Sequence, residues 1–340
     1  MYDILFTGDT FLNTKMLPRG GEFFTLSIEK LFTCCNNICI NLETTIGTGG
    51  VKVPKAFNFQ APPEALRELS KNGIKICSLA NNHSLDYGQE GLIVTKDILK
   101  QNDFTFIGTN ESNRADLEVN GKRICVSSYY GNQDGLAKLH TEEIKKEIQH
   151  IKKSVDYLIV CLHWGEEYVA YPSPEQQIIA HNLIDSGANV VIGHHPHVIQ
   201  GFEHYKNGLI FYSLGNFNFF VDHPYAKELV ETTKAYCVGL NFNATGKVGY
   251  DIIPVHINEN WQPEIINETN EKERFFRYLK NISTPLSTSK GIGKYFYLAE
   301  VSPHFFHNHL YSWKKRINNY GGKQLVQMVK WLLHPATYKY

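Results

Sequence analysis

The chain lacks long apolar runs and an excess of charge of either sign. No stretch reaches the roughly 18 apolar residues that a membrane-spanning helix requires. The N-terminus, MYDILFTGDT, has neither a basic segment nor a small-residue cleavage site. We therefore expect a cytoplasmic protein without a signal peptide or transmembrane segment. Lysine plus arginine and aspartate plus glutamate number 34 each, which argues against a protein held on nucleic acid by bulk charge.

Cysteine is sparse and odd in number. The seven cysteines are scattered through strand-like segments, a pattern typical of reduced thiols in a cytoplasmic protein. Cys34, Cys35 and Cys39 are close together, but cysteines in strands are more often small core residues than metal ligands. We expect these three to be core residues.

Acidic residues are missing from the C-terminal end. Residues 301–340 contain no aspartate or glutamate but six lysine and arginine residues, interleaved with aromatic ones. Helices are expected at 304–319 and 322–334, with a glycine pair between them. The segment is either a basic amphipathic cap packed on the domain or an element that docks on a membrane surface or an assembly complex. We favour the cap.

Short β-rich runs alternate with helical ones over the first 260 residues, and several runs are apolar on both faces. This alternation predicts a layered α/β fold with a sheet covered on both sides. The expected helices lie at 62–72, 87–101, 141–153 and 174–187. The expected strands lie at 2–8, 37–43, 74–81, 123–130, 157–164, 188–193, 208–215 and 235–242.

The pattern changes near residue 258, where a polar connection and a helix are expected within 258–283. We therefore divide the chain into a domain at 1–258 and a helical extension at 259–340.

Polar side chains follow six of the expected strands. These strands end in GD, NLE, ANNH followed by Asp86, HWGE, GHHPH and SLGNF. Functional groups in open α/β sheets gather at the carboxyl ends of the strands. Aspartate, glutamate, asparagine and histidine are residue types that bind divalent cations. A single strand end of this kind has a structural explanation, but six together indicate a metal site.

Three histidines, His194, His195 and His197, follow one strand directly. They form either a histidine-rich surface turn or a set of metal ligands. On an extended segment, residues two positions apart point to the same side. His195 and His197 are then expected to act together, and His194 is expected to face away as a structural residue.

These segments resemble the CapA family of capsule and poly-γ-glutamate synthesis proteins, within the calcineurin-like metallophosphoesterase superfamily. The resemblance covers residues 3–255. Its motifs are the GD end, NLE, FNFQAPPEALREL, SLANNHSLDYGQEGL, LHWGEEY, IGHHPHVIQGFEHY and YSLGNF. It implies a four-layer α/β/β/α sandwich, to which this chain adds the helical extension.

The resemblance also implies a set of site residues. His83 beside Asp86 matches the histidine that protonates the leaving oxygen or orients the substrate. Asn216 is expected to orient a neighbour or to make a turn. The implied metal ligands are Asp9, Glu43, Asn82, His163, His195 and His197.

The chain departs from the superfamily pattern at two positions. Phe11 stands where the first motif has a histidine ligand, and Glu43 stands in place of the bridging aspartate. The loss of one nitrogen ligand predicts either a single metal ion or a pair with one ion loosely held. The mixed nitrogen and carboxylate ligands favour Mn²⁺, Fe²⁺ or Zn²⁺. Glu166 and Glu167 are expected to be solvated loop residues outside the ligand set.

Two functions follow from the resemblance. The first is a metal-dependent hydrolase, of phosphoesterase type, that acts on a cell-surface polymer or its precursor. The second is a non-catalytic metal- and polymer-binding subunit of a capsule or poly-γ-glutamate assembly complex. Phe11 favours the second function, whereas the intact pair Asn82 and His83 favours the first.

Overall fold

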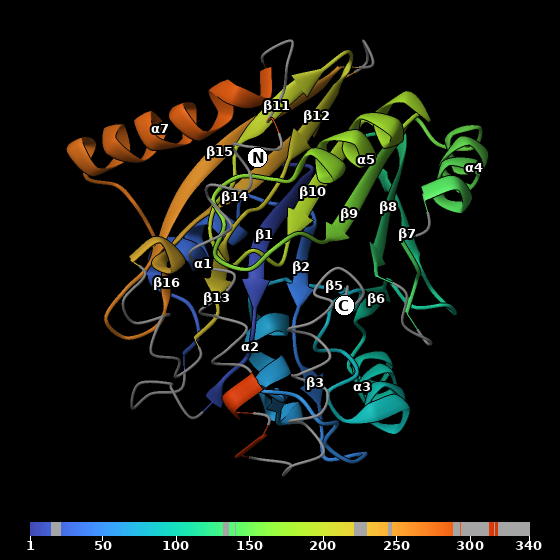
Figure 1. Ribbon diagram of the computed structural model, residues 1–340, viewed down its shortest axis with the longest axis vertical. Coiled ribbons are helices and arrows are strands. Elements are labelled where there is room, and N and C mark those ends of the chain that lie inside the picture. Colours follow the sequence, from blue (N-terminus) through green and yellow to red (C-terminus); the bar gives the residue numbers. More distant parts are fainter. Residues whose placement is uncertain are drawn as a thin grey trace.

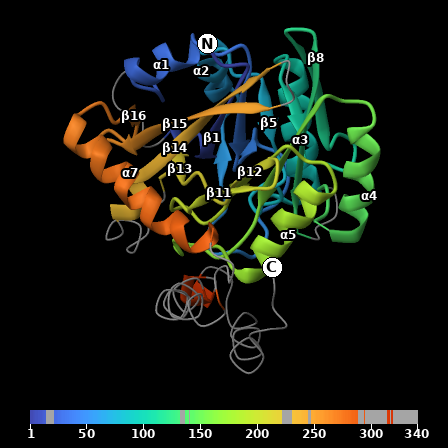
Figure 2. The same ribbon diagram turned by 90° about the horizontal axis from the view of Figure 1, so that it is seen from above.

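The computed structural model describes residues 1–14, 22–131, 136–139, 141–220, 230–243, 247–287, 293, 313–315 and 317–318. Two large sheets lie face to face, with helices on their outer faces (Figures 1 and 2). The predicted helices at 304–319 and 322–334 lie almost entirely outside the described residues.

The first sheet has the strand order β16-β15-β14-β1-β2-β5-β6, and β13 also pairs with β1. Strands β1, β2, β5 and β6 are parallel, and the β14–β16 side is antiparallel. Its strands are β1 (Ile4–Thr10), β2 (Ile38–Leu42), β5 (Ile76–Ser78), β6 (Thr105–Ile107), β13 (Asn216–Asn218), β14 (Lys234–Phe242), β15 (Val248–Ile257) and β16 (Pro263–Ile265). A separate two-stranded pair joins β3 (Thr45–Ile46) to β4 (Gln60–Ala61).

The second sheet has the order β11-β12-β10-β9-β8-β7, with a parallel centre and an antiparallel strand at each edge. Its strands are β7 (Arg114–Val119), β8 (Lys122–Tyr130), β9 (Tyr157–His163), β10 (Val190–His194), β11 (Phe202–Tyr205) and β12 (Gly208–Phe211). The carboxyl ends of β1, β2, β9 and β10 point to the same end of the molecule (Figure 1).

Three apolar layers hold the sandwich together. In β8, Ile124 and Val126 face the core between the sheets, whereas Cys125 faces the outer helices. This alternation buries both faces of a strand because successive side chains point to opposite sides. α1 (Leu26–Phe32), the short η2 (Pro63–Ala65), α2 (Leu66–Lys71) and α3 (Gly88–Gln101) cover the first sheet, and α4 (Thr141–Lys152) and α5 (Pro174–Asp185) cover the second.

The structure confirms the predicted four-layer sandwich together with its eight predicted strands and four predicted helices. The helix expected within 258–283 is α7 (Thr269–Ser283), which follows the short η3 (Val230–Thr233) and strands β14–β16 and precedes η4 (Thr284–Ser287). Phe275, Leu279 and Ile282 of α7 pack into the core between the sheets. The division of the chain at residue 258 stays a prediction.

The cysteines agree with the sequence prediction only in part. All seven cysteines are free thiols, and Cys39 is a core residue as predicted. The prediction for Cys34 is wrong, since this residue is exposed in the turn after α1, and Cys35 is only partly buried.

Among the described residues, no helix is long and apolar enough to cross a membrane.

Candidate metal centre

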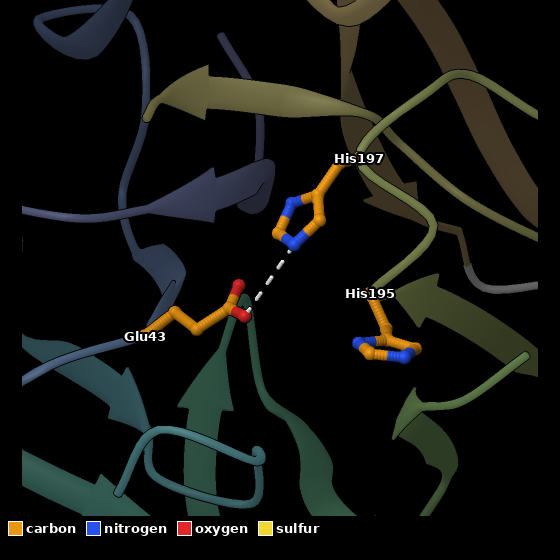
Figure 3. A group of neighbouring side chains, drawn as sticks. All are labelled: Glu43, His195 and His197. Carbon is orange, nitrogen blue, oxygen red and sulfur yellow. Dashed lines mark ion pairs between the residues drawn. The ribbon is translucent and has the colours of Figure 1, made fainter. Parts of the chain in front are cut away.

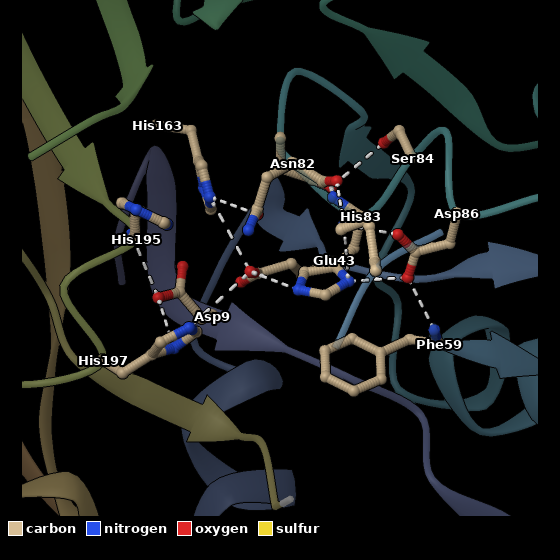
Figure 4. A network of polar contacts seen from close by, with 12 residues as sticks. Asp9, Glu43, Phe59, Asn82, His83, Ser84, Asp86, His163, His195 and His197 are labelled. Carbon is tan, nitrogen blue, oxygen red and sulfur yellow. Dashed lines mark hydrogen bonds and ion pairs between the residues drawn. The ribbon is translucent and has the colours of Figure 1, made fainter. Parts of the chain in front are cut away.

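The predicted site residues meet where the parallel strands end (Figure 4). β1 carries Asp9 near its end, and the turn after β2 carries Glu43. β9 ends at His163, and the loop after β10 carries His195 and His197. The loop between β5 and α3 contributes Asn82, His83 and Asp86.

Glu43 lies at the centre of the group. Its Oε1 atom is 3.7 Å from Nε2 of His163 and 3.8 Å from Nε2 of His197. The same oxygen is 3.9 Å from Nε2 of His83. All three distances are too long for a direct hydrogen bond, and this buried oxygen has no hydrogen-bond partner among the described residues. A buried carboxylate oxygen without a partner, surrounded by imidazole nitrogens, is an arrangement that a cation would complete.

Two groups of potential ligands among the described residues share Glu43. Glu43, His195 and His197 form one group (Figure 3), and Asp9, Glu43 and His163 form the other. In each group the ligand atoms lie within 4.8 Å of one another. Nδ1 of His195 is also buried without a partner in the described part of the chain. The donor types and the two unpartnered atoms fit a divalent transition ion.

Burial determines the protonation of these ligands. It raises the pKa of Asp9 to about 7 and holds the pKa of Glu43 well above its usual value, because a desolvated carboxylate is disfavoured. Burial lowers the pKa of His197 to about 4 and that of His163 and His195 well below the usual value. The imidazoles are therefore neutral, as metal ligands must be, and a bound cation would favour the ionised carboxylates.

Three asparagines orient the ligands. Asn41 donates from Nδ2 to Oδ1 of Asp9 at 2.8 Å, and Oδ1 of Asn82 lies 2.9 Å from Nε2 of His163. Nδ1 of His197 donates to Oδ1 of Asn216 at 2.9 Å, which leaves Nε2 facing Glu43. The prediction that Asn216 orients a neighbour is thus confirmed.

The closing histidines converge for a different reason from the one predicted. His195 and His197 have φ values of +98° and +57°, so this segment is not extended. Positive φ is uncommon for residues other than glycine, although histidine adopts it more readily than most. Here the backbone N–H of His195 donates to Oδ2 of Asp9 at 3.1 Å and helps to hold the turn. His194 faces away as predicted, with Nε2 3.0 Å from the carbonyl oxygen of Thr7.

His83 is held from two sides. Its Nδ1 lies 2.6 Å from Oδ2 of Asp86, which also accepts the backbone N–H of Phe59 at 2.6 Å (Figure 4). The Phe59 ring stacks on the imidazole with the ring centres 3.9 Å apart. Burial opposes ionisation of Asp86, but His83 and Lys55 together hold its pKa below the usual value. Burial lowers the pKa of His83 to about 4. Because Nδ1 is bound to Asp86, it is Nε2 of His83 that faces Glu43, at 3.9 Å from Oε1.

Phe11 belongs to an aromatic cluster at one side of the centre. Its ring stacks on Phe59 with 4.4 Å between the ring centres and contacts Phe219 edge-on at 6.0 Å. Phe219 in turn lies 4.5 Å from the His197 ring. At the position where the resemblance implies a nitrogen ligand, the described residues place a cluster of aromatic rings that contacts His83 and His197.

Sequence reasoning missed several contributors. Lys55 lies outside every quoted motif, and Phe59 lies within FNFQAPPEALREL but was given no role; both reach the site from the segment between β3 and β4. Glu167 was expected to be solvated. It is only partly exposed, and burial raises its pKa to about 7.

The fold and the site define the class of protein. The α/β/β/α sandwich of this strand order is a metallophosphoesterase-like fold, and carboxylate, amide and imidazole donors lie at its strand ends. A hypothetical protein from Thermus thermophilus shows the same fold, with a TM-score of 0.50 and 17% identity over 77% of this chain and 98% of that chain.

Sequence comparison assigns the chain to a family within this fold. Residues 3–220 match the family described as "Bacterial capsule synthesis protein PGA_cap", and the chain belongs to this family. The capsule biosynthesis protein CapA of Bacillus anthracis is 32% identical over 259 residues, which is 71% of this chain and 60% of that protein. The PGA biosynthesis protein CapA of Bacillus subtilis strain 168 is 26% identical over 279 residues, 77% of this chain and 72% of that protein.

Proposed function

We propose that the protein is a metal-dependent hydrolase of phosphoesterase type that acts in the synthesis of a capsule or another cell-surface polymer. The observation that supports this proposal best is the pair of ligand groups that share Glu43, whose Oε1 atom has no partner among the described residues. A shared carboxylate is suited to holding two ions close together, the arrangement used for in-line displacement at phosphorus.

The distances between the donor atoms support one ligand assignment. We assign Asp9, Glu43 and His163 to one ion, with Oδ1 of Asn82 beside His163, and Glu43, His195 and His197 to the other. The donors favour Mn²⁺, Fe²⁺ or Zn²⁺ over Mg²⁺ or Ca²⁺. When bound, such ions lower the pKa of water and offset the negative charge of the transition state.

His83 and Asp86 are assigned the proton transfer. Nδ1 of His83 is bound to Asp86, so Nε2 is the nitrogen that can exchange a proton with the leaving oxygen. Asp86 stabilises the imidazolium that forms when Nε2 takes up a proton. The Phe59 ring limits rotation of the imidazole and excludes water from one of its faces.

The substrate class comes from the relatives. Those compared above are named for capsule and PGA biosynthesis, so we assign a cell-surface polymer, polysaccharide or poly-γ-glutamate, or its precursor. The chain spans about 60% of the length of the Bacillus anthracis relative.

A non-catalytic metal- and polymer-binding subunit is the second candidate. Phe11 favours it, because its ring occupies an aromatic cluster where the superfamily has a ligand. Because a phenylalanine ring offers no ligand atom, the site has one donor fewer with which to hold two ions firmly. Residues 301–340 are then the candidate contact with an assembly complex or a membrane surface.

The test begins with protein purified without added metal. Elemental analysis measures the bound ions, and hydrolysis of generic phosphoesters is then followed with added Mn²⁺. Bound metal with hydrolysis supports the enzyme. Bound metal with polymer binding but no hydrolysis of phosphoesters, glycans or γ-glutamyl chains supports the binding subunit. Protein that takes up no divalent ion contradicts both.

A further inference from the structure

Lys55 contacts the loop between β5 and α3 at two points. This lysine lies between β3 and β4, and its side chain is 28% exposed. Nζ donates to Oδ1 of Asp86 at 2.6 Å and to the backbone carbonyl oxygen of Asn82 at 2.7 Å. One ammonium group therefore joins both ends of the segment that contains His83.

The two contacts constrain different parts of the site. The carbonyl contact fixes the peptide of Asn82, whose side chain lies 2.9 Å from Nε2 of His163. The carboxylate contact fixes Asp86, whose other oxygen holds Nδ1 of His83. Nζ is 3.5 Å from Nδ1 of His83, the nitrogen that faces away from Glu43. Lys55 therefore approaches the imidazole from the side opposite to Glu43.

We propose that Lys55 is a positioning residue that holds the segment 82–86, and with it the Asn82 ligand and the His83 imidazole, in register with Glu43. The inference rests on the metal centre proposed above. It adds a residue that no motif marks.

Positioning and charge make opposite predictions for metal affinity. If Lys55 acted only as a nearby positive charge, its removal would strengthen cation binding, since like charges repel. If it holds Asn82 in place, its removal should weaken cation binding. Loss of a group that orients ligands typically costs about 10–100-fold in affinity or activity. The sign of the change therefore separates the two roles.

The experiment compares Lys55→Met, Lys55→Gln and Lys55→Arg with the unmodified full chain. Mn²⁺ affinity is measured by calorimetry, and hydrogen exchange of the backbone around 82–86 is measured in metal-free protein. Lys96→Met is the matched control, because Lys96 also pairs with a carboxylate, Glu111 at 2.9 Å, but lies on α3 outside this network.

We expect Lys55→Met to weaken Mn²⁺ binding about tenfold and to speed exchange around 82–86, whereas Lys55→Arg and the control change little. Gln is too short to reach both acceptors and should behave like Met. If Lys55→Met fails to fold, the Lys55→Gln variant is used for the same measurements. In an active protein, Lys55→Met should lower kcat more than it raises KM.

Unchanged or tighter Mn²⁺ binding in both neutral variants would overturn the inference. Unchanged exchange around 82–86 would also overturn it. A wild-type chain that binds no Mn²⁺ would instead contradict the proposed function, and the exchange measurement would still decide whether Lys55 holds the segment.

Discussion

At the scale of single residues, His195 offers the most direct test of the ligand set. Its Nδ1 is buried without a partner among the described residues, and neutral imidazole is a good ligand. We expect His195→Ala to lower the metal content sharply in elemental analysis. The control is His204→Ala. This variant removes an exposed imidazole that lies outside the site and hydrogen-bonds to the hydroxyl of Tyr250. Full metal occupancy in His195→Ala would show that the assignment is wrong.

His83 should separate chemistry from metal binding. Its Nε2 faces Glu43 at 3.9 Å, but Nδ1 is held by Asp86, so we place it in proton transfer. His83→Ala is expected to lower kcat by about 10²–10⁴-fold with the metal retained, as measured by steady-state kinetics and elemental analysis on the same preparation. Loss of metal from this variant would make His83 a ligand.

The buried carboxylates predict a pH dependence of stability. Burial raises the pKa of Asp9 to about 7 and that of Glu43 well above its usual value, so near neutral pH the folded chain binds more protons than the unfolded chain. The free energy of unfolding of metal-free protein should then fall as the pH rises from about 6.5 to 8. The site histidines have lowered pKa values, so they make the free energy of unfolding rise with pH. They do so mainly below about pH 6.5, the pKa of histidine in the unfolded chain.

Thermal unfolding of metal-free and Mn²⁺-saturated protein over this range checks the prediction. Bound Mn²⁺ should remove the slope, because the ion replaces the protons. A metal-free protein that becomes more stable toward pH 8 would contradict it.

At the scale of elements, the close approach of β1 to the turn before β13 sets the position of Asp9. A Cβ atom on Gly8 would lie 2.0 Å from the carbonyl oxygen of Gly215, which accepts the backbone N–H of Asp9 at 2.9 Å. Only glycine allows this approach. We expect Gly8→Ala to destabilise the fold by at least about 1–3 kcal/mol and to weaken metal binding, as measured by denaturant unfolding and calorimetry.

Gly249→Ala on β15 is the matched control. The nearest atom to its added Cβ is 3.7 Å away, an ordinary contact. If Gly8→Ala bound metal as tightly as the control, the spacing of these segments would not determine the position of Asp9.

At the scale of the whole molecule, the described residues near the C-terminus favour a packed cap. Trp313 is 5% exposed, and Nζ of Lys315 lies 3.6 Å from the centre of the Phe57 ring, a cation–π contact. We expect Trp313→Ala to cost about 3–5 kcal/mol of unfolding free energy. Leu26→Ala, at a 65% exposed position, should cost little.

Vesicle binding tests the alternative for this segment. Strong binding of the full chain to anionic vesicles that falls with salt, together with an unchanged stability of Trp313→Ala, would favour a docking element over a cap.

Sequence reasoning predicted the sandwich and most of the residues that meet at the candidate site. Apolar runs on both faces of the strands require cover on both sides, and the polar ends of parallel strands must meet at one edge. Asp9, Glu43 and His163 lie together for this reason. Strand β7 was missed because it is an edge strand with three exposed residues, and its pattern is weakly apolar.

The chain by itself determined which donors are present and that Phe11 removes one of them. Only the tertiary structure decided how they are held. The turn with positive φ at His195 and His197 depends on Asp9 far away in sequence. The Phe59 stack and the Lys55 contacts depend on how the loop between β3 and β4 packs against the segment 82–86. Local pattern encodes strands and their ends, whereas the contacts that orient side chains join segments that only folding brings together.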